Sequence, residues 1–236
     1  MAMWWKRSMK RELRAAGAAW LLFVVLCLHA AAVPVHHIKA VDADNHSVIV
    51  NRTGVVTALI GTSADSQDAA RQAGVAVYPF QGRNDFQLIV AVDLRDSLAN
   101  WAPSLAVSRM RSSLDDEAIE LKPYFLKNGN RSNPRNSSHV IPDFNGKIFT
   151  QLGWPQTSSD LRAIIYGADG REFQRFEKVD NMDVLYNSVR AAIAANLALR
   201  KAHEAAAPPI PVTRSTALSP PMPPLPPEKP VAPTKP

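Results

Sequence analysis

The sequence predicts an α/β fold, in which buried parallel strands are connected by helices. Two apolar runs, at 55–60 and 87–94, are rich in β-branched residues and have the composition of strands covered on both faces. A segment with helical spacing follows each run. A third observation is an Asp-Gly turn between two alternating segments within 161–176, which is typical of a hairpin.

The first 32 residues have the pattern of a secretory signal. A basic stretch, Lys6 to Arg14, precedes an apolar stretch, Ala15 to Leu28, and the small residues Ala30-Ala31-Ala32 form a cleavage site. The alternative is an uncleaved membrane anchor over residues 15–32. The sequence therefore predicts an exported protein that is periplasmic or secreted, and anchored to a membrane only if this segment is retained.

Three histidines follow the predicted signal, at His36, His37 and His46. Neutral imidazoles close to a chain terminus can bind Cu²⁺ or Zn²⁺, so a periplasmic metal carrier is one alternative function. The favoured interpretation is an extended lead-in with exposed polar residues, because no cysteine or carboxylate stands at ligand spacing beside them.

The segment 54–74 reads as a strand, a polar turn and a helix. The strand at 55–60 leads into a turn at Gly61–Ser63, and Ser63 or Asp65 is expected to cap a helix that ends at Gly74. Such a turn directs backbone N–H groups and the positive end of a helix at a ligand. The candidate binding residues here are Thr62, Ser63, Asp65 and Ser66.

The second strand ends in charged residues. Residues 75–83 read as a loop, and the strand 87–94 contains Asp93 and is followed by Arg95. The carboxyl ends of parallel strands are where α/β proteins bind ligands, although a cap at Asp96 or Ser97 explains the same residues. We expect the two strands to be adjacent and parallel. Arg83, Asp93, Arg95 and His139 are candidates for a site around an anion.

The remaining pattern completes one domain. In order, it predicts a helix with a break near Pro123, a mobile polar loop, a strand, a hairpin and a last helix, at 100–122, 128–138, 139–143, 161–176 and 181–199. The domain is expected to span 33–204. Residues 205–236 hold twelve prolines and are predicted to be a disordered tail, a passive spacer or else a ligand for an aromatic groove.

Charge and cysteine content exclude several functions. The formal charge is +6, of which residues 1–32 carry +4 and residues 205–236 carry +2, so the predicted domain is neutral. A neutral domain does not favour nucleic-acid binding. The single cysteine, Cys27, lies in the apolar stretch of the signal, so the domain has no disulfide and no cysteine ligand for a metal.

Two segments resemble the thioredoxin-like superfamily, in particular its redoxin branch of alkyl-hydroperoxide-reductase and thiol-specific-antioxidant proteins. They are DFNGKIFTQLGW at Asp143–Trp154 and IIYGADGREFQRF at Ile164–Phe176, the latter followed by a predicted helix. The resemblance covers about residues 50–199 and implies a three-layer α/β/α sandwich with a mixed central sheet. It places the family's catalytic cysteine near Thr62–Ser66, where this chain has none.

These observations predict a binding module without thiol redox activity in a bacterial-type cell envelope. Thiol chemistry needs a thiolate, and the chain after the predicted signal has no sulfur nucleophile. The expected partner is a protein or a small anionic ligand, and no cofactor is implied. The alternatives are the metal carrier, and an enzyme or anion-binding protein with a cysteine-free site at the 61–67 turn.

Overall fold

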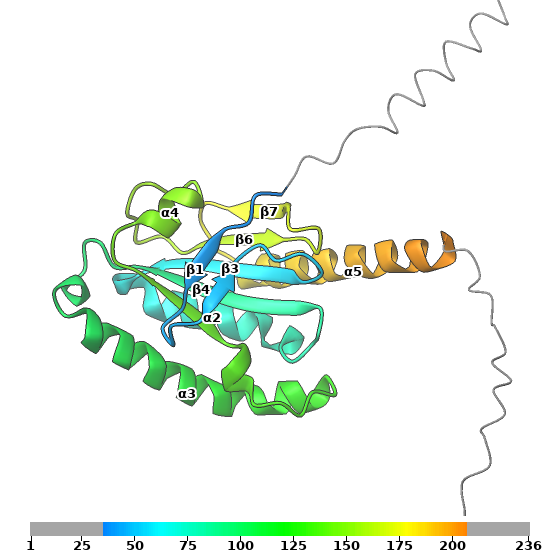
Figure 1. The fold of residues 1–236 in the computed structure, drawn as a ribbon, viewed down its shortest axis with the longest axis horizontal. Coiled ribbons are helices and arrows are strands. Elements are labelled where there is room, and N and C mark those ends of the chain that lie inside the picture. Colours follow the sequence, from blue (N-terminus) through cyan, green and yellow to red (C-terminus); the bar gives the residue numbers. More distant parts are fainter. Residues whose placement is uncertain (1–34, 207–236) are drawn as a thin grey trace, which may run out of the picture.

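The computed structural model describes residues 35–206, which form a mixed five-stranded sheet covered on both faces (Figure 1). The predicted signal or anchor at 1–32 and nearly all of the predicted tail lie outside the described residues. The strands and helices are β1 (Lys39–Val41), β2 (Ser47–Ile49), β3 (Val56–Ser63), α2 (Gln67–Val77), β4 (Phe86–Asp93), α3 (Pro103–Lys127), β5 (His139–Asp143), α4 (Lys147–Gln151), β6 (Arg162–Tyr166), β7 (Glu172–Phe176) and α5 (Met182–Ala206).

The sheet has the strand order β5-β4-β3-β6-β7. The central strand β3 is parallel to β4 and antiparallel to β6, and β5 extends the parallel half. The prediction of two adjacent parallel strands is therefore confirmed. A β-α-β unit joined in one sheet to a hairpin and a final helix is the thioredoxin-like arrangement, so the fold is a thioredoxin-like α/β sandwich.

The two faces of the sheet bury separate apolar clusters. Alternate residues of a strand point to opposite faces. Ile60 and its neighbours on one face pack against α2 and α5, whereas Leu59 and Ile89 on the other face pack against α4 and the small β1–β2 hairpin. Because both faces are covered, the central strands need apolar residues at nearly every position, which is the continuous pattern seen in the sequence.

Strand β3 is longer than predicted. Gly61, Thr62 and Ser63 belong to the strand and not to a turn, and a 3₁₀ turn at Ala64–Ser66 follows. The ring of Trp154 packs on Gly61, where a Cβ atom would lie 2.6 Å from Cζ3 of that ring. A glycine in this strand is therefore a packing requirement and not a strand end.

The helices also extend beyond their predicted ends. Helix α2 continues through Gly74 to Val77, and Gly74 itself is buried. Helix α3 continues through Pro123 to Lys127, because Leu121 and Phe125 on either side of the proline are buried against Tyr78. Apolar burial outweighs the local helix-breaking signals at both places. Among residues 35–206, none of the helices combines the length and apolar character that a membrane span requires.

The polar loop after α3 is tied to the domain, although its composition predicted mobility. The side chain of Asn128 donates to the backbone oxygen of Gln81 at 2.7 Å, and the side chain of Asn130 donates to that of Gly82 at 3.0 Å. Pro134 is buried. Polar residues in this loop therefore satisfy backbone carbonyl groups of the α2–β4 connection.

Candidate functional site

The carboxyl ends of three parallel strands meet at one edge of the sheet. Ser63, Asp93 and Asp143 are the last residues of β3, β4 and β5, and they stand side by side in register. A cavity of about 230 Å³ opens beside the first two. Its lining is entirely hydroxyl-bearing or acidic apart from one alanine, and consists of Ser63, Ala64, Asp65, Asp93, Asp96, Ser97, Thr157, Ser158 and Ser159.

A chain of hydroxyl groups stands at the strand-to-helix connection where the resemblance placed a cysteine. The Oγ atoms of Ser63 and Ser66 are hydrogen-bonded at 3.0 Å, and the Ser66 hydroxyl donates to the backbone carbonyl of Ser159. The buried Thr62 hydroxyl donates to the backbone oxygen of Ser66 at 3.1 Å. These bonds join the end of β3, the start of α2 and the 157–159 loop. Thr62 itself is 2% exposed and faces no ligand.

The predicted helix caps are wrong. Neither the 3₁₀ turn after Ser63 nor helix α2 after Ser66 receives a capping hydrogen bond from a side chain. Ser63 instead bonds to Ser66, and Asp65 is exposed at the mouth of the cavity. The hydroxyl of Ser66 is directed to another part of the chain, so the serines hold the cavity wall together.

Arg95 is engaged within the chain. Its Nε and Nη2 atoms donate to the two carboxylate oxygens of Asp93 at 3.0 and 2.6 Å, and its Nη1 donates to the backbone oxygen of Pro155 at 2.6 Å. The hydrogen bond to Asp93 raises the pKa of the guanidinium, which therefore stays charged. Arg95 links the end of β4 to the segment after α4, and its donors are directed to protein oxygens rather than to the cavity.

Arg83 does not join this group. It precedes β4, whereas the cavity lies at the far end of that strand, and it forms a two-pronged ion pair with Asp85 at 2.8 and 2.9 Å. The predicted site of Thr62, Ser63, Asp65, Ser66, Arg83, Asp93 and Arg95 is therefore only partly assembled. Ser63, Asp65 and Asp93 line the cavity, and Ser66 and Arg95 support its walls.

Five lining residues escaped the sequence analysis as site residues. Asp96 and Ser97 were assigned only as possible caps, and Ser97 does accept a hydrogen bond from the backbone of Ala99 at the start of the Leu98–Trp101 turn. Thr157, Ser158 and Ser159 come from a segment far along the chain. The run of three hydroxyl residues was visible, but its place beside β3 depends on the antiparallel pairing of β6 with β3.

The electrostatics of the cavity are acidic. Asp93 is neutralised by Arg95, but Asp65 and Asp96 bring two further carboxylates to the lining, and the lining includes no lysine, arginine or histidine. A small anion would meet like charge here. The arrangement suits a ligand that offers hydrogen-bond donors or a positive charge.

His139 lies away from this cavity. It begins β5, whereas Asp143 at the cavity end finishes that strand. Four residues of a strand span about 13 Å. The His139 ring bonds instead to the buried Asp42 carboxylate, with Nδ1 and Oδ2 2.9 Å apart. The ring therefore provides no base for Ser63, and the alternative of a catalytic His139 beside the serine turn is wrong.

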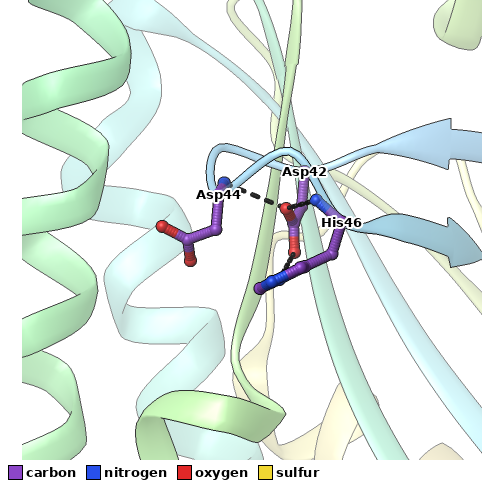
Figure 2. A group of neighbouring side chains, drawn as sticks. All are labelled: Asp42, Asp44 and His46. Carbon is purple, nitrogen blue, oxygen red and sulfur yellow. Dashed lines mark hydrogen bonds and ion pairs between the residues drawn. The ribbon is translucent and has the colours of Figure 1, made fainter.

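The carboxylates near His46 form a compact group in the β1–β2 turn (Figure 2). Oδ1 of Asp42 accepts the backbone N–H groups of Asp44 and His46 at 2.9 and 2.8 Å. Burial by itself would raise the pKa of Asp42, but the hydrogen bonds from His139, His46 and Asp44 outweigh it and lower that pKa. Asp42 is thus an ionised anchor that connects the turn to β5.

A metal ion does not fit this group well. Asp44 is paired with the guanidinium groups of Arg135 and Arg111 at 2.7 and 3.4 Å, which compete with a cation for its oxygens. His37 lies at the open end of the β1–β2 hairpin, bonded to the backbone of Asn51, while His46 lies at its turn. About four residues of strand separate them, or about 13 Å. A single site formed by His36, His37 and His46 is therefore ruled out.

Fold and site together define a thioredoxin-like domain that has serines in place of thiols among its described residues. The sequence matches no known family model and no curated protein. Three solved structures are similar, in each case with low identity. They are the exposed lipoprotein thioredoxin Etrx1 of Streptococcus pneumoniae strain TIGR4 (9% identity, TM-score 0.42, covering 66% of this chain and 99% of that one), a putative thioredoxin of Neisseria meningitidis (13%, 0.44, 70% and 92%) and StoA of Bacillus subtilis (6%, 0.42, 66% and 98%). At these scores they say nothing about the chemistry of this chain.

Proposed function

We propose that this protein is an exported, non-catalytic thioredoxin-like module of a bacterial-type cell envelope that binds a partner protein and has no thiol redox activity. The observation that supports this most is the Ser63–Ser66 hydroxyl pair. It stands at the end of β3, directly before helix α2, and its hydrogen bonds lie within the chain. The place of the reactive thiol is thus filled by groups that cannot carry a disulfide or a sulfenic acid.

The proposed binding surface is the rim of the acidic cavity, with Asp65, Asp96, Ser97 and Ser158 as its accessible polar groups. Carboxylates and hydroxyls on this rim favour a partner segment that presents basic or hydrogen-bond-donating side chains. A small anionic ligand has less support, because Arg95 is committed to Asp93 and Pro155.

The first test concerns redox chemistry. The chain from Val33 onward is expected to show no turnover above the buffer blank in insulin reduction or peroxide consumption. Ser63 and Ser66 have the spacing of a Cys-x-x-Cys motif, and their Oγ atoms are 3.0 Å apart. The double variant Ser63→Cys, Ser66→Cys is therefore expected to gain measurable insulin reduction.

The matched control is Ser104→Cys, Ser108→Cys, which places two thiols on the exposed surface of α3 and should remain inactive. Turnover by the parent chain that survives repurification would overturn the proposal. A double variant at Ser63 and Ser66 that forms no disulfide and reduces no insulin would show that this connection does not correspond to the family's redox site.

The second test concerns binding. The chain from Val33 onward has no cysteine, so Ser158→Cys gives one attachment point for a thiol-directed photo-crosslinker on the cavity rim. We expect one discrete adduct in envelope extracts of the producing cells, which Asp65→Lys combined with Asp96→Lys reduces at least several-fold. Ser112→Cys, exposed on α3, is the control site. Equal adducts from both positions would contradict a partner surface at the cavity.

A further inference from the structure

An exposed apolar surface adjoins the acidic cavity. Leu98 and Trp101 are 87% and 89% exposed, and Leu105 is 53% exposed. The first two are the most exposed large apolar side chains of the described residues, and they lie three positions apart in a 3₁₀ turn, where such residues lie one above the other. Asp96 and Ser97 of the cavity directly precede this turn. We call Leu98, Trp101 and Leu105 the Trp101 surface.

We infer that the Trp101 surface binds the chain's own proline-rich segment, Ser219–Lys229, with the Lys229 ammonium group at the acidic cavity. This inference goes beyond the proposed function, because it holds whether or not the cavity also binds a partner protein. Three independent features of the molecule support it: the chemistry of the segment, its charge and its reach.

The chemistry of the segment matches the surface. Residues 219–229 read SPPMPPLPPEK, and proline-rich segments of this kind adopt an extended polyproline II helix that binds to surfaces of exposed aromatic side chains. The backbone conformation is already restricted before binding, so little entropy is lost when the segment docks. Met222 and Leu225 offer apolar side chains between the prolines. Trp101 supplies the aromatic group that this mode of recognition requires.

The charges are complementary. Residues 207–236 carry Arg214, Lys229 and Lys235 against Glu228, a net charge of +2. Asp65 and Asp96 line the cavity without a cationic neighbour in that lining. Lys229 stands at the end of the proline-rich run, so a segment that lies along the Trp101 surface can place this ammonium group beside these carboxylates.

The segment can reach this surface. Helix α5 begins close to the cavity, because Val179 bonds to Leu161, two residues after Ser159 of the lining. The helix has 25 residues and is therefore about 37 Å long. It runs away from the sheet, and its C-terminal end projects beyond it (Figure 1). Residues 207–229 extend about 70 Å as a polyproline II helix, nearly twice that distance.

Attachment to the same chain makes even a weak contact effective. A segment on a linker of this length is present at an effective concentration of the order of millimolar, so modest affinity is sufficient for the intrachain complex to dominate. The same surface on a second copy of the chain would compete only at comparable protein concentrations. Dilution therefore separates the two occupants.

The test is nuclear magnetic resonance of the ¹⁵N-labelled chain from Val33 onward. This chain has two tryptophans, Trp101 and the buried Trp154, and so gives two indole N–H signals, which the variant Trp101→Phe assigns. Replacing Pro223, Pro224, Pro226 and Pro227 by serine is expected to shift the Trp101 signal and leave the Trp154 signal in place. The control variant replaces Pro208, Pro209 and Pro211 by serine, outside the proposed segment, and is expected to shift neither.

Charge reversal tests the orientation. Lys229→Glu is expected to move the Trp101 signal toward its position in the distal proline variant, whereas Lys235→Glu leaves it unchanged. The shifts should be independent of protein concentration. A Trp101 signal that is identical in the parent and the distal proline variant overturns the inference. Shifts that disappear on dilution overturn the intrachain arrangement and assign the surface to a second copy.

Discussion

Replacing Trp154 by alanine is expected to lower the free energy of unfolding by about 3–5 kcal/mol, the range for removal of a large aromatic side chain from a core. Trp154 is 2% exposed, and its ring lies on Gly61 and near Phe149, with ring centroids 5.8 Å apart. Its Nε1 donates to a carboxylate oxygen of Glu177 at 3.0 Å. Alanine leaves a cavity that this rigid sheet cannot fill.

Urea unfolding followed by circular dichroism measures this effect. The control is Ile119→Ala on the exposed side of α3, which is expected to change stability by no more than about 0.5 kcal/mol. The pair with Gly61 gives a second measurement. Gly61→Ala should destabilise the parent, where its Cβ would lie 2.6 Å from the ring, and cost less in Trp154→Ala. A loss below about 1 kcal/mol for Trp154→Ala would contradict the packing of this ring.

Replacing Gly82 by alanine is expected to lower the free energy of unfolding by about 2–5 kcal/mol. Gly82 has φ +83°, a left-handed conformation that costs a residue with a Cβ atom about 1–2 kcal/mol. The added Cβ would also lie 2.6 Å from the Cα of Phe125, a backbone atom in a buried turn of α3. Overpacking of this kind costs a further 1–3 kcal/mol or so.

Gly129 separates these two contributions. It has φ +76°, and no atom lies within 4 Å of the position that an added Cβ atom would take, so Gly129→Ala should show only the conformational cost. The same urea titration applies to both variants. Equal losses at Gly82 and Gly129 would mean that the contact with Phe125 relaxes freely and that only the backbone conformation matters.

Local signals in the sequence were sufficient for the frame of the domain. The apolar runs of β3 and β4 predicted adjacent parallel strands because strands covered on both faces need apolar residues throughout. The hairpin between β6 and β7 was visible from Asp169-Gly170, where Gly170 has φ +77° and the Asp169 carboxylate accepts the N–H of Arg171 at 3.0 Å. The loss of the thiol also followed from sequence alone, since a missing residue type requires no geometry.

The boundaries that failed were decided by contacts between distant segments. Gly61 resembled a strand end until Trp154, more than ninety residues later, was found on top of it. Gly74 and Pro123 resembled helix ends, but burial on the neighbouring residues keeps α2 and α3 intact. A pattern within one segment cannot report which distant side chain will cover it.

The candidate site depends still more on tertiary structure. Composition alone identified the serines and charged residues at the ends of β3 and β4, and the register of the sheet brings Ser63 and Asp93 together. Only the folded chain directs Arg95 to Asp93 and Pro155, places Arg83 at the opposite end of β4, and brings Ser159 to the Ser66 hydroxyl. The reason is physical: residue type determines what a side chain can bind, whereas its partner is determined by which strands and loops pack beside it.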